Sequence, residues 1–163
     1  TPEDWRRALE VNILGPAIVA DAVQETLREN APGSILFFAS VAGQIGSQSD
    51  PPYSAAKAAV INFTQCAAKD LAPYDVRVNA MSPGMIKTPL NRAVWKAWHD
   101  QSPADERLDY DTWAAEKIQK ISPLGRWQTA EDVANTAVFL MSSRAQNVTG
   151  QTLNVDGGQV MHS

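Results

Sequence analysis

The sequence has one cysteine, no run of about 18 apolar residues and no cluster of lysine and arginine. Cys66 therefore cannot form a disulfide within the chain, and its small apolar neighbours favour a buried, reduced thiol. The missing apolar run argues against a membrane span, and the net charge of −4 argues against a nucleic-acid surface. Since no basic or secretory stretch follows Thr1, we expect a cytoplasmic protein without membrane, nucleic-acid or metal partners.

The hydrophobic pattern predicts a single α/β domain over residues 1–163. Helices are expected at 1–28 with a break near 15–16, at 53–71, at 129–141, and as two short segments within 87–127. Strands are expected at 34–39, 76–81 and 151–155. Because strands alternate with helices, they should form a parallel sheet with helical crossovers. A sheet of so few strands leaves an exposed edge, so it looks incomplete.

Three polar residues should meet at the carboxyl edge of this sheet. Ser40 follows the strand at 34–39, and open α/β sheets hold their ligands beyond the carboxyl ends of their strands. Tyr53 and Lys57 are four residues apart on the next predicted helix, so they share one face. A packed tyrosine and an ordinary surface lysine would have the same spacing, so the interpretation depends on Ser40 as well.

A hydroxyl, a phenol and an ammonium suit proton transfer at an alcohol or a ketone. An ordinary phenol has a pKa of about 10 and is a poor base at neutral pH. A neighbouring ammonium favours the phenolate form, which can take a hydroxyl proton during alcohol oxidation and return it during ketone reduction. A serine hydroxyl beside the phenol can donate a hydrogen bond to the carbonyl oxygen as negative charge develops there.

These residues resemble the signature of the short-chain dehydrogenase/reductase family, in which a serine precedes a Tyr-x-x-x-Lys motif. Here the match is Ser40 followed by Tyr53-Ser54-Ala55-Ala56-Lys57. The resemblance implies that Tyr53 is the acid/base and that Ser40 orients the substrate. It implies that Lys57 activates Tyr53 and holds the nicotinamide ribose. The fold it implies is the C-terminal part of a Rossmann-like, doubly wound parallel sheet in three α/β/α layers.

Asn12 is a candidate fourth catalytic residue. Pro16 lies four residues later and has no N–H, so the Asn12 carbonyl should lose its helical partner and the helix should bend. In the family, an asparagine that matches Asn12 helps to hold a water on a proton path to the lysine. The alternative is that Asn12 is merely tolerated within a helix.

The stretch from Asn79 to Pro89 is a second match to the family. The resemblance implies that Pro83 and Gly84 pack against the nicotinamide, because glycine allows a close approach of the backbone. It also implies that Ile86 and Thr88 contact the carboxamide. Thr88 is equally suited to cap a helix that begins at Pro89, and both roles can hold together.

The segment at about 88–127 lies where the family places its substrate-binding lid. Trp95, Trp98 and Trp113 give this segment apolar surface, and Trp95 is a candidate substrate contact. A closing lid would exclude water from the reaction. For each tryptophan the alternative is that it only attaches the lid helices to the body. The length of the lid suits a secondary alcohol, a polyol or a small ketone, and a bulkier acyl substrate stays open.

The glycine-rich turn that holds a dinucleotide pyrophosphate in this family is missing. Gly43 and Gly46 have neither its spacing nor a following helix in the required place. Nothing in the sequence therefore separates NAD from NADP. We expect that the family's N-terminal half is absent, and that this polypeptide alone binds dinucleotide weakly and turns over slowly or not at all.

The sequence thus predicts an NAD(P)-dependent oxidoreductase that interconverts a secondary alcohol, such as a polyol or hydroxy compound, and its ketone. The alternatives are a 3-oxoacyl thioester reductase of the same family, an epimerase or dehydratase among its extended relatives, and a catalytically incomplete fragment or scaffold. Family members associate through the helices that match 11–28 and 53–71, which implies a homo-oligomer, either a dimer or a tetramer.

Overall fold

The computed structural model describes residues 1–46 and 50–161, and it contains a parallel sheet at its centre. The three strands, in the spatial order in which they occur along the chain, are β1 (Gly33–Phe38), β2 (Val76–Pro83) and β3 (Thr152–Val155). β2 pairs with β1 over six residues and with β3 over four. All three strand predictions and the parallel arrangement are confirmed.

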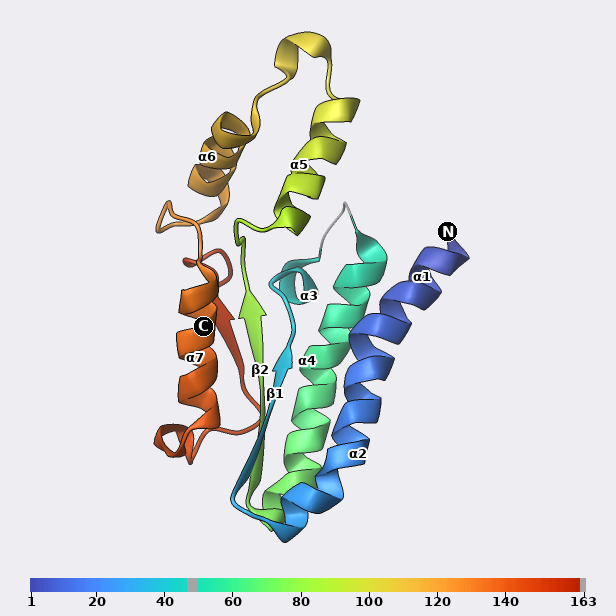
Figure 1. The fold of residues 1–163 in the computed structure, drawn as a ribbon, viewed down its shortest axis with the longest axis vertical. Helices are drawn as coiled ribbons and strands as arrows, with labels where there is room; N and C mark the ends of the chain where they lie inside the picture. Colours follow the sequence, from blue (N-terminus) through green and yellow to red (C-terminus); the bar gives the residue numbers. More distant parts are fainter. Residues whose placement is uncertain (47–49, 162–163) are drawn as a thin grey trace.

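Helices cover both faces of the sheet and its carboxyl end (Figure 1). Along the chain they are α1 (Pro2–Leu9), η1 (Glu10–Leu14, a π-helical turn), α2 (Gly15–Glu29), α3 (Ala42–Ile45), α4 (Pro51–Leu71), η2 (Ala72–Tyr74), α5 (Pro89–Gln101), η3 (Ala104–Glu106), α6 (Tyr110–Ile121), α7 (Ala130–Met141) and η4 (Ser143–Ala145). α2 and α4 pack on one face and α7 on the other, while α5 and α6 project beyond the carboxyl ends of the strands. The predicted three-layer α/β architecture is confirmed.

Two helices begin with the capping signals visible in the sequence. At α1, the Thr1 hydroxyl accepts from the backbone N–H of Asp4, whose carboxylate is bonded in return to Thr1. At α7, Thr129 and Asp132 form the same reciprocal pair. A cap of this kind stabilises a helix by about 1 kcal/mol, so the helix starts are fixed locally.

The core lies between the sheet and α4. Val78, Ala80 and Met81 of β2 are completely buried, as is Ala56 of α4, and Val60 is 1% exposed. A fully buried valine contributes roughly 1.5–3 kcal/mol by leaving water. The central strand and the inner face of α4 therefore form a firm base for residues at the carboxyl edge.

Two local predictions were wrong. The predicted loop at 43–49 begins instead with the short helix α3, and the rest of that loop, 47–49, lies outside the described residues. Cys66 is exposed rather than buried, because α4 turns Thr64 and Ala68 toward the core and so directs the residue midway between them outward. In the part of the chain that the structure describes, none of the helices has the length and apolar character needed to span a bilayer.

Candidate active site

The first turn of α4 holds Tyr53. Asp50 is the N-cap of this helix, and its carboxylate accepts a hydrogen bond from the backbone N–H of Tyr53 at 3.1 Å. Pro51 and Pro52 follow the cap, where their missing N–H groups cost no helical hydrogen bond. Tyr53 is half-buried, so part of the residue remains accessible.

Lys57 lies one turn further along α4, on the same face. Its Nζ atom is 5.6 Å from the centroid of the Tyr53 ring and donates a 2.8 Å hydrogen bond to the carbonyl oxygen of Phe38. Burial lowers the pKa of the Lys57 ammonium below its ordinary value, because a charge loses hydration there. The Lys57 ammonium and the Tyr53 ring thus lie close together, as their spacing predicts, and their catalytic roles stay predictions.

The Phe38 carbonyl lies on the free edge of the sheet. The N–H groups of Gly33 and Ala39 donate toward β2, and residues on a strand alternate between its two edges, so Phe38 faces away from β2. Its side chain is 52% exposed. Lys57 thus supplies a hydrogen bond that a neighbouring strand would otherwise make.

Ser40 begins the connection that leaves β1. Its Oγ atom accepts from the backbone N–H of Ala42 at 3.2 Å, and the carbonyl of Ala42 accepts from the Ser54 hydroxyl at 3.0 Å. Gly43 touches the backbone of α4, since a Cβ atom built on it would lie 2.6 Å from the carbonyl carbon of Lys57. These contacts hold the Ser40 loop against the helix that carries Tyr53 and Lys57.

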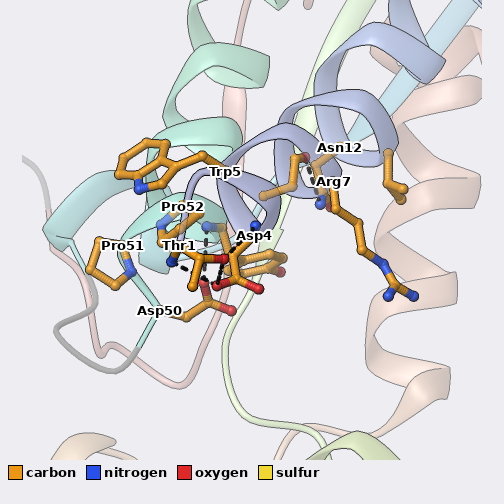
Figure 2. Close-up of a pocket in the computed structure, with 11 residues that line it drawn as sticks. Thr1, Asp4, Trp5, Arg7, Asn12, Asp50, Pro51 and Pro52 are labelled. Carbon is orange, nitrogen blue, oxygen red and sulfur yellow. Dashed lines mark hydrogen bonds and ion pairs between the residues drawn. The ribbon is translucent and has the colours of Figure 1, made fainter.

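Asn12 lies in the π-helical turn between α1 and α2. The N–H of Gly15 donates to the carbonyl of Glu10, five residues earlier, so the predicted break in the helix takes the form of this wider turn. Asn12 donates through its side-chain amide to the carbonyl of Ala8 at 3.1 Å. Asn12 and Tyr53 both line a cavity of about 780 Å³ between α1 and the start of α4 (Figure 2). The role of Asn12 in proton transfer stays a prediction.

The residues after β2 also lie at the carboxyl edge. Pro83 accepts a hydrogen bond from the backbone N–H of Val41, which joins this turn to the Ser40 loop. A Cβ atom on Gly84 would lie 2.8 Å from Oε1 of Gln128 and 2.9 Å from Cα of Asp156. Glycine is therefore required at position 84 by the protein's own packing, in addition to any approach of a cofactor.

Ile86 and Thr88 have structural partners of their own. Ile86 forms an isolated parallel bridge with Gln128, and the Thr88 hydroxyl accepts from the backbone N–H of Asn91 at 3.4 Å as the N-cap of α5. The capping role considered for Thr88 is thus present. A contact of either residue with a nicotinamide stays a prediction.

The lid is held together by aromatic packing. Tyr110, Trp113 and Ala114 of α6 are buried against the partly buried residues Met85, Trp95, Trp98, Leu108 and Trp127. The indole N–H of Trp95 donates to the Leu108 carbonyl at 3.1 Å, and its ring lies edge-on to Tyr110. Trp95 therefore attaches the two parts of the lid, and its contact with substrate stays a prediction.

Comparison with known proteins identifies the family. A family model described as enoyl-(acyl carrier protein) reductase matches residues 1–160. The chain belongs to the short-chain dehydrogenase/reductase family. It is 39% identical over 160 residues to a 3-oxoacyl-[acyl-carrier-protein] reductase of Synechocystis, covering 98% of this chain and 57% of that protein. An NAD-dependent glycerol dehydrogenase of Listeria innocua is 35% identical, with 96% of this chain and 56% of that protein covered.

The structure agrees with this family assignment. Sorbitol-6-phosphate 2-dehydrogenase SrlD from Erwinia amylovora superposes with a TM-score of 0.90 at 29% identity, covering 99% of this chain and 62% of the solved one. The Rossmann-like fold is therefore established. The short-chain dehydrogenase/reductase chain described here spans little more than half the length of these curated relatives.

Sequence reasoning missed the residues that position the site. Asp50 fixes the backbone of Tyr53, Ser54 ties the Ser40 loop to α4, and Gly43 allows that loop to touch the helix. The capping role of Asp50 was readable, because an acidic residue directly before two prolines is a helix-start signal. The roles of Ser54 and Gly43 depend on contacts across the fold and left no local signal.

Proposed function

We propose that this chain is the catalytic portion of an NAD(P)-dependent oxidoreductase that interconverts a secondary alcohol and its ketone. The observation that carries the proposal is the Lys57 ammonium, 5.6 Å from the Tyr53 ring at the carboxyl end of a Rossmann-like sheet. A phenol beside a cation at this edge suits proton transfer at an alcohol or a ketone, because the phenolic oxygen can take the substrate proton and return it.

Tyr53, Ser40 and Asn12 each have a part in the proposed reaction. The Tyr53 hydroxyl oxygen takes the substrate hydroxyl proton during oxidation and returns it during reduction. The Ser40 hydroxyl donates a hydrogen bond to the substrate oxygen, where negative charge develops. Asn12 supports the proton path to Lys57. Bound nicotinamide would supply the hydride acceptor for oxidation or the hydride donor for reduction.

The chain offers residues for the nicotinamide end of a dinucleotide but no glycine-rich turn, among the described residues, for its pyrophosphate. Tyr53, Lys57, Pro83 and Gly84 gather at the carboxyl edge, with Ile86 and Thr88 just beyond, and these would hold the nicotinamide end. Within residues 1–46 and 50–161, no strand leads through a glycine-rich turn into a helix, so that kind of pyrophosphate site is lacking there. NAD and NADP both stay open: a named relative is NAD-dependent, and L-sorbose reductase of Gluconobacter frateurii, a structural neighbour, is complexed with NADPH.

Two substrate classes have support. Polyols and their ketones are favoured by the structural likeness to SrlD, with its TM-score of 0.90, and by the glycerol dehydrogenase relative. Reduction of a 3-oxoacyl thioester is the alternative, favoured by the 39% identical Synechocystis relative. We propose polyols and their ketones as the main substrate class.

Association with further copies is also part of the proposal. Val11, Leu14, Ile18 and Val19 on the outer surface of η1 and α2 are each more than half exposed. Such a row of apolar side chains on an amphipathic helix favours burial against another subunit. We also propose a cytoplasmic location. The net charge of −4 favours small-molecule partners over nucleic acids or anionic membranes.

The test is an activity screen of the intact natural protein with NAD and NADP against a panel of secondary alcohols, polyols and 3-hydroxyacyl thioesters. We expect dinucleotide reduction with at least one secondary alcohol, and no reduction with primary alcohols of the same length. Preference for a thioester would favour the alternative. Absence of turnover with every member of the panel would contradict an oxidoreductase.

A further inference from the structure

One face of α6 carries a charged residue among aromatic and aliphatic ones. Tyr110, Trp113, Ala114 and Ile118 are at most 7% exposed, and their spacing marks the inner face of the helix. Lys117 is seven residues after Tyr110 and therefore lies on the same face, where it is half-buried. A lysine in such a position loses hydration, and that loss has to be offset by its contacts.

The Lys117 ammonium has an aromatic neighbour but no acidic one. Its Nζ atom is 4.4 Å from the centroid of the Trp113 ring. Among the described residues, no carboxylate pairs with it within 4.0 Å, whereas Lys120 on the same helix pairs with Glu116 at 3.7 Å. Burial lowers the pKa of the Lys117 ammonium, because the charge loses hydration there.

Lys117 lines a cavity that extends to the start of α4. The cavity measures about 770 Å³, within the range of small-molecule sites. Its apolar lining comes from α5, α6 and the turn between them: Val94, Ala97, Trp98, Leu108, Trp113 and Ile121. Asp50, the residue that caps the helix of Tyr53, also lines this cavity. The cavity therefore borders the first turn of α4, which carries the proposed acid/base.

We propose that the substrate carries an anionic group, a carboxylate or a phosphate, and that Lys117 binds this group in the lid cavity. The inference rests on the proposed function, since it names the substrate class of the same site. Glu116 and Asp50 do not oppose it: the carboxylate of Glu116 faces Lys120, and that of Asp50 accepts the Tyr53 N–H at the positive end of α4. Because Glu116 and Lys120 neutralise each other, Lys117 is the cation at this cavity without an acidic partner among the described residues, and it would select small anionic hydroxy compounds over neutral ones.

The test compares matched pairs of probes by calorimetric titration of the intact natural protein: 3-hydroxybutyrate against 2-butanol, and a hexitol phosphate against the free hexitol. The anionic member of at least one pair should bind about 10- to 100-fold more tightly, the effect of one charge-assisted contact. The pair that shows the preference separates carboxylate from phosphate. Lys117→Met should remove the preference, while Lys117→Arg should keep it, as should the control Lys96→Met at an exposed lysine of α5 that does not line the cavity.

The pH dependence of the anion preference shows whether it comes from the charge of Lys117 or from the shape of the cavity. As the pH rises through the lowered pKa of Lys117, the ammonium loses its proton, and the anion preference should fall. Lys117→Arg should keep the preference at high pH, because a guanidinium stays charged. The other charged groups at the cavity are Glu116, Lys120 and Asp50.

Two results would overturn the inference: equal or undetectable binding of both members in both pairs, or a preference that survives in Lys117→Met. Failure of the proposed function and failure of this inference give different results. An anion preference without turnover of any alcohol would contradict the oxidoreductase while leaving the anion site, and turnover without the preference would do the reverse.

Discussion

Tyr53→Phe should lower kcat/KM for alcohol oxidation by about 10²- to 10⁴-fold, the usual contribution of a positioned acid or base. The substitution removes only the hydroxyl and keeps the ring beside the Lys57 ammonium, 5.6 Å away. The backbone bond from Tyr53 to Asp50 is also unaffected. The loss should therefore fall on the chemical step. Dinucleotide affinity should change little, because the ring that would lie beside the nicotinamide is kept. Steady-state kinetics of the intact natural protein, with the dinucleotide affinity measured by titration, checks both parts.

A matched control is Tyr74→Phe. Tyr74 lies beyond the other end of α4 and is 46% exposed, and its ring stacks under Arg28 at 4.5 Å. Removing its hydroxyl should leave kcat/KM within about twofold, as expected of a surface change away from the site. If Tyr53→Phe behaved like Tyr74→Phe, Tyr53 would not be the proton-transfer residue.

Gly43→Ala should destabilise the fold by about 1–3 kcal/mol, the usual cost of overpacking. The added methyl group would lie 2.6 Å from the carbonyl carbon of Lys57 and 2.7 Å from the backbone nitrogen of Ala58. Both are backbone atoms of α4, so the clash cannot be relieved by rotating a side chain. Either the Ser40 loop or the helix must move. Urea denaturation measures the free energy of unfolding, and we expect the activity to fall as well because Ser40 and Lys57 are separated.

Gly15→Ala gives the opposite expectation for the same chemical change. Gly15 lies within a helix, and a Cβ atom there would meet nothing closer than 3.5 Å, an ordinary contact. Alanine should raise the free energy of unfolding by about 0.4–1 kcal/mol by restricting the unfolded chain. If both alanine variants were equally stable, the close approach of Gly43 to α4 would be wrong.

Much of the fold was predictable because its signals are local. The buried run at 34–39 predicted β1 to within a residue at each end, and the cap signature at Thr129 predicted the start of α7. The pairing of Tyr53 with Lys57 was predictable for the same reason, since a helix alone fixes residues four apart. The start of α4 was less secure, because the capping by Asp50 was overlooked and the helix begins two residues before Tyr53.

The rest depends on how elements meet. The exposure of Cys66 follows from which face of α4 is turned toward the core, and the apolar neighbours of Cys66 in the sequence did not reveal that face. The hydrogen bond from Lys57 to Phe38 requires the register of β1 against β2, which decides which carbonyls face the free edge. The contact of Gly43 with α4 and the isolation of Lys117 likewise arise only in three dimensions.

The most direct measurement follows a deuterium label. The intact natural protein is incubated with dihydronicotinamide dinucleotide deuterated at C4, in each stereochemical form, and with the ketone of its best alcohol substrate. Mass spectrometry then locates the label in the product. We predict deuterium on the carbinol carbon with the natural protein and at most about 1% as much with Tyr53→Phe in the same time. Label transfer at equal rates by both proteins, or no transfer by either, would contradict hydride transfer assisted by Tyr53.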